Sequence, residues 1–102
     1  MITEYGMALG SEWDGVSEIV ADPRRTEYLK AHLAQVHKAI LKGVPLTGYF
    51  AWTLMDNYEW AEGCRPESCF GMVHIDRDSL QRIPKESYYW YQALAQSGML
   101  PE

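Results

Sequence analysis

The sequence has no excess of positive charge: nine Lys and Arg face fourteen Asp and Glu, and the formal net charge is -5. Proteins that bind nucleic acid need clustered basic side chains to meet the phosphates, and anionic membrane surfaces attract basic segments in the same way. We therefore expect neither nucleic acid nor a membrane among the partners of this chain.

Long apolar runs are also missing. No stretch reaches the roughly 20 residues that a membrane-spanning helix needs. The first residues show no basic region followed by an apolar stretch and a cleavage site, so no secretory signal is indicated. The expectation from these absences is a soluble cytoplasmic protein.

Cysteine is scarce. Cys64 and Cys69 lie five positions apart in one predicted loop, with His74 beyond them. This spacing fits neither a zinc site nor a disulfide framework, so we expect two reduced thiols and no metal or cofactor. His32, His37 and His74 show no pattern of ligand spacing, and each is expected to be structural or solvated.

Apolar and aromatic residues, in contrast, are plentiful. They make up 47% and 13% of the 102 residues, which is a globular composition and not a disordered one. A chain of this length buries only about two thirds of its unfolded surface. It is therefore one small domain or part of a larger one.

The first helix is predicted at 23–42. Asp22 is a good N-cap, Pro23 suits the first helical position, and Gly43 suits a left-handed C-terminal position. An apolar stripe with steps of three and four residues supports this helix. Its members are Leu29, Leu33, Val36 and Ile40.

Strands are predicted on both sides of this helix. Residues 1–3 end one strand, and 46–54 carry strand-forming residues on both faces, as in a buried parallel strand. A second extended stretch covers 70–76, and a closing helix carries the aromatic residues of 87–96. A long surface loop is expected at 7–21.

This order describes an α/β protein with two β/α units. Two units cannot cover both faces of their own strands. The pattern therefore implies a larger parent fold or several copies of the chain.

The run at 48–63 passes from apolar strand residues to aromatic rings that alternate with carboxylates and amides. Flat rings suit the apolar faces of a sugar, and Glu59, Asp56 and Asn57 are placed to meet its hydroxyls. Glu4 follows the other predicted strand, where β/α folds place reactive groups. From position alone, an attacking carboxylate and an exposed acid at a frayed terminus are equally good interpretations of Glu4.

Three motifs resemble glycoside hydrolase family 1, the β-glucosidase family. Residues 2–6 read Ile-Thr-Glu-Tyr-Gly, which is similar to the signature Thr-Glu-Asn-Gly of this family. Residues 50–60 look like its last-strand motif, and 70–76 with 82–91 resemble its closing segment. The resemblance implies that 1–102 form the C-terminal quarter of a TIM (β/α)8 catalytic barrel: the end of strand 7, helix 7, strand 8 and helix 8.

By this resemblance the parent enzyme hydrolyses terminal β-D-glucosides with retained configuration. Glu4 would be the nucleophile and Trp52 a platform beside the sugar. Glu59 and Trp60 would bind hydroxyls of the sugar, and Phe70 would line the pocket. Tyr5 stands where the family has Asn and would add bulk beside Glu4.

The Asn-Glu-Pro motif that carries the general acid/base in this family is missing from the sequence. We therefore expect the chain alone to be inactive. Its partners would be a β-glucoside or glucose, together with the N-terminal part of the barrel or other copies of the chain. The alternative is a non-catalytic sub-barrel fragment, or a sugar-binding module, that self-associates.

Overall fold

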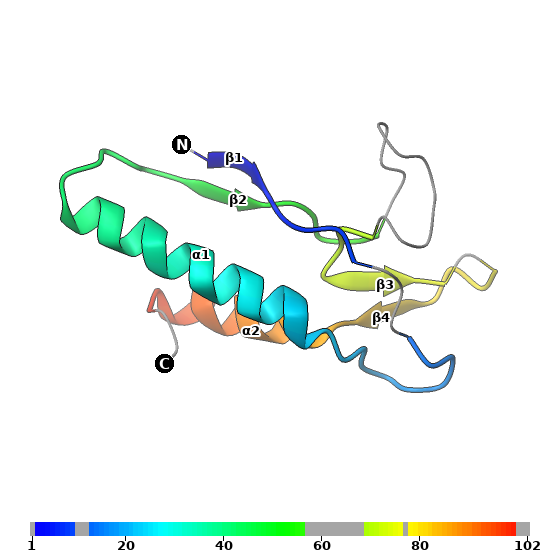
Figure 1. The fold of residues 1–102 in the computed structure, drawn as a ribbon. Coiled ribbons are helices and arrows are strands. Elements are labelled where there is room, and N and C mark those ends of the chain that lie inside the picture. The colour runs from blue at the N-terminus through cyan, green and yellow to red at the C-terminus, as the bar shows by residue number, and fades with distance from the viewer. Residues whose placement is uncertain (1, 10–12, 57–68, 77, 100–102) are drawn as a thin grey trace.

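The computed structural model describes residues 2–9, 13–56, 69–76 and 78–99. Figure 1 shows two long helices side by side, a pair of strands along one of them, and a short hairpin at one end. The elements in chain order are β1 (Ile2–Tyr5), α1 (Pro23–Leu41), β2 (Tyr49–Ala51), β3 (Val73–Ile75), β4 (Arg82–Pro84) and α2 (Glu86–Ser97).

β1 and β2 are parallel, as predicted. Ile2 lies opposite Tyr49 and Tyr5 opposite Ala51, with an irregular register between the two pairs. The predicted burial of the second strand on both faces is wrong for this chain, because Phe50 is 57% exposed. Among the described residues β1 is the only strand that pairs with β2. A two-stranded sheet leaves apolar side chains uncovered.

The second extended stretch forms part of a hairpin that the sequence analysis did not predict. β3 and β4 pair antiparallel, with His74 opposite Ile83. The turn between them is closed by a hydrogen bond from the Leu80 N–H to the Asp76 carbonyl (2.7 Å), and Leu80 has a positive φ of 61°. Pro84 ends the edge strand β4, where its missing N–H is tolerated.

α1 agrees with its prediction to within one residue, and Gly43 adopts the expected positive φ (97°) behind it. The apolar stripe is covered only in its first half: Leu29 and Leu33 are buried, whereas Ile40 is 45% exposed. Its second half borders an apolar groove of about 430 Å³ between the two helices. The groove is lined by Leu33, Val36, His37, Ile40, Leu94, Gly98 and Met99.

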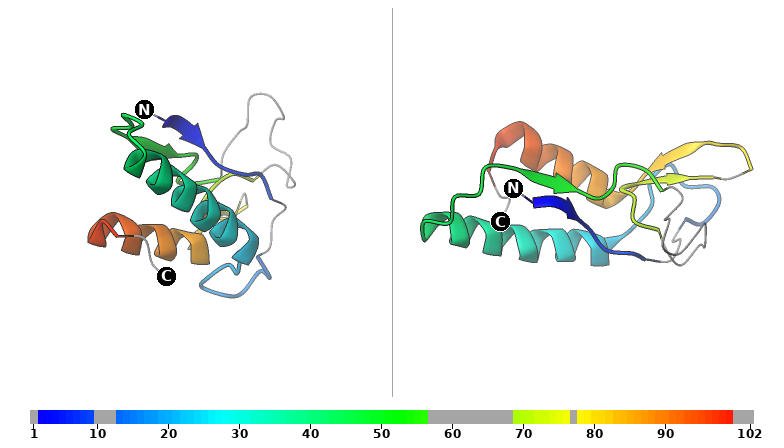
Figure 2. Two further views of the ribbon diagram at one scale, coloured as in Figure 1. Left: turned by 60° about the vertical axis from the view of Figure 1, so that its left-hand side comes forward. Right: turned by 90° about the horizontal axis from the view of Figure 1, so that it is seen from above.

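α2 also agrees closely with its prediction, and Gly98 is left-handed at its C-terminal end (φ 70°). Among its aromatic residues Tyr89 is 45% exposed. The molecule is elongated, with extents of 47 × 29 × 19 Å (Figure 2). Its radius of gyration of 14.4 Å exceeds the value of about 13 Å typical of a compact domain of this length.

The long loop after β1 is attached to the rest of the fold near both ends. Leu9 exchanges two backbone hydrogen bonds with Cys69 (2.9 and 3.2 Å), and both side chains are buried. Val20 donates to the Pro84 carbonyl and accepts from the Glu86 N–H, each at 2.9 Å. No helix in the described part of the chain is long and apolar enough to cross a membrane.

Candidate active site

Glu4 and Trp52 lie at neighbouring strand ends. Because β1 and β2 are parallel, their carboxyl ends meet at the same edge of the sheet. The Trp52 N–H donates to the Tyr5 carbonyl at 2.9 Å, which joins the residue after Glu4 to Trp52. Glu4 is exposed, and Trp52 is 37% exposed. Both side chains are therefore accessible to a ligand.

Gly6 allows the backbone after β1 to lie close to the backbone of Trp52. A Cβ atom at position 6 would lie 1.8 Å from the carbonyl oxygen of Trp52. Only glycine fits there without moving backbone. The Trp52–Thr53 peptide bond is cis.

Phe70 comes from a third segment that reaches the same region. The Thr53 N–H donates to the Phe70 carbonyl at 3.2 Å, and the Phe70 side chain is half-buried. The backbones that carry Glu4, Trp52 and Phe70 are thus joined by hydrogen bonds. Asn57, Glu59 and Trp60, which were also predicted to meet the sugar, lie outside the described residues.

The Tyr5 side chain packs toward α1 and not beside Glu4. Its ring lies 5.6 Å from Tyr28, 5.3 Å from His32 and 5.7 Å from Tyr49, measured between centroids. Successive side chains of a strand point to opposite faces. The expected crowding of Glu4 by Tyr5 is therefore wrong, and Tyr5 belongs to the contact between sheet and helix.

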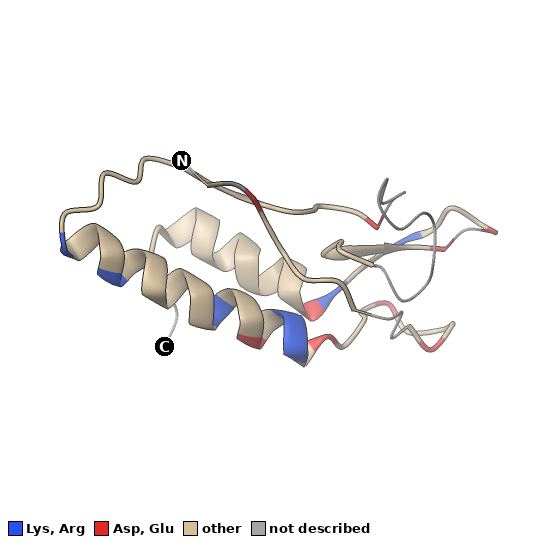
Figure 3. Cartoon of the chain, turned by 45° about the horizontal axis from the view of Figure 1, so that its top comes forward, with Lys and Arg blue, Asp and Glu red and all other residues tan. Residues whose placement is uncertain are grey.

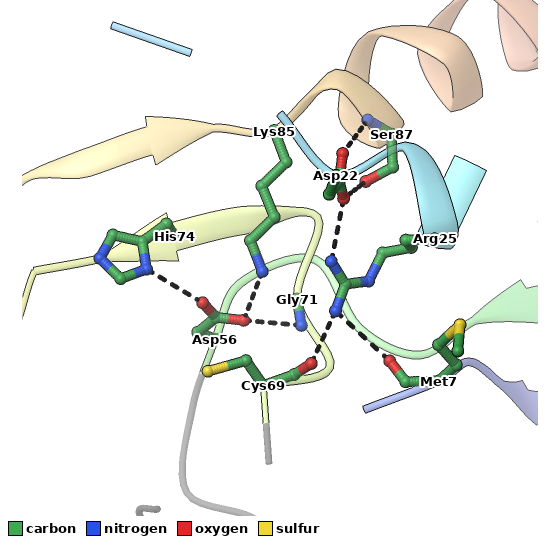
Figure 4. A network of polar contacts seen from close by, with 9 residues as sticks. All are labelled: Met7, Asp22, Arg25, Asp56, Cys69, Gly71, His74, Lys85 and Ser87. Carbon is green, nitrogen blue, oxygen red and sulfur yellow. Dashed lines mark hydrogen bonds and ion pairs between the residues drawn. The ribbon is translucent and has the colours of Figure 1, made fainter. Parts of the chain in front are cut away.

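Asp56 does not present a free carboxylate to a sugar. Its Oδ1 accepts hydrogen bonds from the Gly71 N–H (2.8 Å) and from Lys85 Nζ (3.0 Å), and its Oδ2 lies 3.4 Å from Nδ1 of His74 (Figure 4). Burial lowers the pKa of Lys85, as does the charge of Arg25, and Asp56 opposes both effects. Asp56 thus has a structural role, which corrects the expectation that it meets sugar hydroxyls.

A second buried polar cluster joins the starts of the two helices. Asp22 Oδ2 accepts from Arg25 Nη1 (2.9 Å) and from the Ser87 hydroxyl (2.6 Å), while Asp22 Oδ1 accepts from the Ser87 N–H (2.9 Å). Arg25 Nη2 also donates to the carbonyls of Cys69 (2.7 Å) and Met7 (3.4 Å) (Figure 4). Through these two bonds Arg25 holds the segment before Phe70 against the loop that follows Glu4, whereas Ser87 bonds to Asp22.

Asp22 therefore differs from its predicted role. Its side chain makes no capping hydrogen bond to α1. It binds instead the N-terminus of α2, where Lys85 at the N-cap position provides no side-chain cap. Nothing in the local sequence around Asp22 indicates a partner 65 residues away.

Glu4 is the only charged residue in β1 and β2. Figure 3 shows the basic positions of α1 spaced along that helix, apart from the strand pair. In the described part of the chain, no three His, Cys, Asp or Glu side chains gather in a way that would hold a metal ion. The chemistry that the described residues offer is that of an exposed carboxylate on a strand whose neighbouring segments carry the aromatic residues Trp52 and Phe70.

Comparisons with known proteins identify the family of the chain. The model of glycosyl hydrolase family 1 matches residues 1–99. The chain is 48% identical to β-glucosidase A of Thermotoga maritima over 103 aligned positions, which cover 99% of the chain but 22% of that protein. It is 46% identical to β-glucosidase 42 of Arabidopsis thaliana, over 88% of the chain and 18% of that protein.

Solved structures show the same relation. The family 1 β-glucosidase from Thermotoga maritima superposes with a TM-score of 0.88 at 44% identity, covering 99% of this chain and 22% of that one. Its complex with castanospermine gives a TM-score of 0.87. The chain thus spans about a fifth of the length of its relatives, and its fold corresponds to part of their barrel. These 102 residues belong to glycosyl hydrolase family 1.

Proposed function

We propose that the chain is part of a retaining β-glucosidase in which Glu4 is the nucleophile. The observation that carries the proposal is the exposed Glu4 side chain near the carboxyl end of β1. The next residue, Tyr5, accepts a backbone hydrogen bond from the Trp52 N–H, which brings the two segments together. The relatives of the chain in Thermotoga maritima and Arabidopsis thaliana are named β-glucosidases, and these names support a terminal β-linked glucose as the substrate.

In the proposed mechanism the Glu4 carboxylate attacks the anomeric carbon while a carboxylic acid protonates the departing glycosidic oxygen. A covalent glycosyl-enzyme forms. Water then hydrolyses it, with the second carboxyl group acting as base. In retaining enzymes the two carboxyl groups stand about 5–5.5 Å apart.

The substrate subsite is assembled around Glu4. Trp52 covers an apolar face of the sugar, Phe70 lines the pocket, and Glu59 and Trp60 bind sugar hydroxyls. Because the sequence has no Asn-Glu-Pro motif, the proton donor comes from barrel residues outside these 102.

The exposed sheet supports this need for a larger barrel. Phe50 and Leu54 are 57% and 54% exposed, and a parallel sheet is ordinarily covered on both faces. We propose that the N-terminal part of the barrel supplies this cover.

The same exposed residues favour one alternative, a non-catalytic module that covers its sheet by self-association. Light scattering distinguishes the two. A stable oligomer of the chain supports the module, and a monomer argues against it.

The catalytic proposal is tested in a hybrid barrel. The chain replaces the matching 22% of Thermotoga maritima β-glucosidase A, and hydrolysis of an aryl β-glucoside is measured. We expect turnover by the hybrid and none by the chain alone. The Glu4→Gln variant of the hybrid should lose on the order of 10⁴-fold in kcat, as enzymes do when a nucleophile is removed.

Glu27→Gln is the matched control, because Glu27 is also an exposed acid and lies on α1. It should leave kcat unchanged. A Glu4→Gln hybrid with undiminished turnover would remove Glu4 from the reaction. Turnover by the monomeric chain would show that the proton donor lies within the 102 residues.

A further inference from the structure

We propose that Lys85 and Asp56 form a buried positioning pair that sets the distance between Trp52 and Phe70. Neither residue touches the sugar in this proposal. Their role is to hold together the two segments that carry the aromatic side chains of the subsite. The inference rests on the proposed function, because it assigns a role to residues behind the same site.

Asp56 joins the two segments directly. It lies four residues after Trp52 in one continuous segment. Its Oδ1 accepts from the Gly71 N–H at 2.8 Å, and Gly71 immediately follows Phe70. One carboxylate oxygen therefore connects the segment of Trp52 to the segment of Phe70.

The two backbones are in contact at this point. A Cβ atom at position 71 would lie 2.2 Å from the backbone nitrogen of Asp56, so only glycine fits. The Asp56 N–H donates to the Val73 carbonyl at 2.9 Å, and the Val73 N–H donates to the Leu54 carbonyl at 2.9 Å. A change in the position of Asp56 is thus passed on to both segments.

Lys85 holds the Asp56 carboxylate from behind. Its Nζ lies 3.0 Å from Asp56 Oδ1, and the two side chains are only 5% and 7% exposed. Lys85 is itself fixed, because its N–H donates to the Met72 carbonyl at 2.9 Å. A charge-assisted hydrogen bond in a buried setting is short and directional, so it fixes the carboxylate in place.

His74 approaches the other oxygen of the same carboxylate. Its Nδ1 is 3.4 Å from Asp56 Oδ2, and Trp13 packs on its ring at 5.3 Å between centroids. Without Lys85, Asp56 would remain as a buried charge that keeps the approach of His74 but loses its ammonium partner. It would then turn toward solvent or draw in water.

The consequence for the proposed reaction is a loss of sugar placement. A misplacement of about 1 Å can lower a rate by on the order of 100-fold, even when it originates away from the reacting atoms. Trp52 and Phe70 lie on opposite sides of the Asp56–Gly71 contact. Loosening this contact therefore changes their spacing without changing either side chain.

The experiment uses the hybrid barrel with Lys85→Met and Asp56→Asn, and Ser87→Ala as the control. Ser87→Ala removes a comparably buried hydrogen bond to Asp22 but leaves the Asp56–Gly71 contact intact. Inhibition by deoxynojirimycin reports binding of the sugar ring, and KM and kcat are measured with an aryl β-glucoside. The inhibition constant should rise about 10- to 100-fold in Lys85→Met and Asp56→Asn, and by less than about twofold in Ser87→Ala.

Equal inhibition constants in Lys85→Met and the unsubstituted hybrid would overturn the proposal. So would an equally large rise in Ser87→Ala, since the effect would then follow from lost stability. If Lys85→Met does not fold, Asp56→Asn decides alone, because Asn keeps the size of Asp but removes the negative charge that pairs with Lys85. Failure of the proposed function looks different: the unsubstituted hybrid is then inactive, or Glu4→Gln retains full turnover.

Discussion

Asp22 could act as an ordinary N-cap or as the centre of a buried ion pair. Replacing Asp22 by Ala distinguishes these two roles, because each predicts a different loss of folding stability. Removal of an ordinary N-cap costs about 0.5–2 kcal/mol. In the structure, however, the Asp22 side chain is 1% exposed, accepts three hydrogen bonds and pairs with Arg25, whose side chain is 4% exposed. Breaking a buried ion pair costs about 3–5 kcal/mol, because the remaining charge loses its partner.

We therefore expect Asp22→Ala to lower the free energy of unfolding by about 3–5 kcal/mol. This is a large part of the roughly 5–15 kcal/mol that stabilises a domain. The assay is urea unfolding of the chain followed by far-UV circular dichroism, which reports both helices. Ser87→Ala, which removes one hydrogen bond to a charged group, should lose roughly 1.5–3 kcal/mol. A loss below about 1 kcal/mol for Asp22→Ala would show that the residue is at most an N-cap.

Two further predictions concern the close backbone contact at Gly6 and the ionisation of three tyrosines. Gly6→Ala should destabilise the chain by at least about 1–3 kcal/mol, because the new Cβ would lie 1.8 Å from the Trp52 carbonyl oxygen and the backbone must shift. Urea unfolding followed by tryptophan fluorescence measures this loss of stability. An unchanged unfolding midpoint would contradict the close approach of Gly6 to Trp52. Burial raises the pKa of Tyr28, Tyr49 and Tyr91 above the ordinary value of 10.0. A raised pKa in the folded state means that the contribution to stability is complete below pH 10 and is lost as the pH rises through the folded-state values. Lys85 acts in the opposite direction, since burial lowers its pKa. We therefore expect the chain to unfold above about pH 10, with the tyrosines ionising cooperatively at the same pH. The ultraviolet absorbance of tyrosinate measures this ionisation. Non-cooperative ionisation of a chain that stays folded would refute this reasoning.

The helices were predictable because their signals are local. The apolar stripe of α1, Pro23 at its start and Gly43 behind it all lie within one continuous segment, and the structure follows them to within one residue. The parallel strand was predictable for the same reason. Its burial was not, since apolar residues on both faces reflect the environment of a larger sheet, and this chain leaves Phe50 exposed.

The hairpin and the polar clusters were not predictable, because their determinants are far apart. Pro84 suits a helix start and an edge strand equally well, and only its pairing with Val73 decides between them. Asp56 meets Lys85 across 29 positions, and Asp22 meets Ser87 across 65. Glu4, Trp52 and Phe70 were predicted through motif resemblance, and the structure adds the backbone hydrogen bonds that join their segments.

The bond between Asp22 and Ser87 has a consequence for the order of events during protein synthesis. Ribosomes add about 5–20 residues per second, so several seconds pass between the appearance of Asp22 and that of Ser87, 65 positions later. During this interval the Asp22 carboxylate has Arg25 within its own segment, but its second partner does not yet exist. We expect α1 to form early and to settle against the sheet only when α2 arrives, because the same carboxylate completes the beginning of both helices.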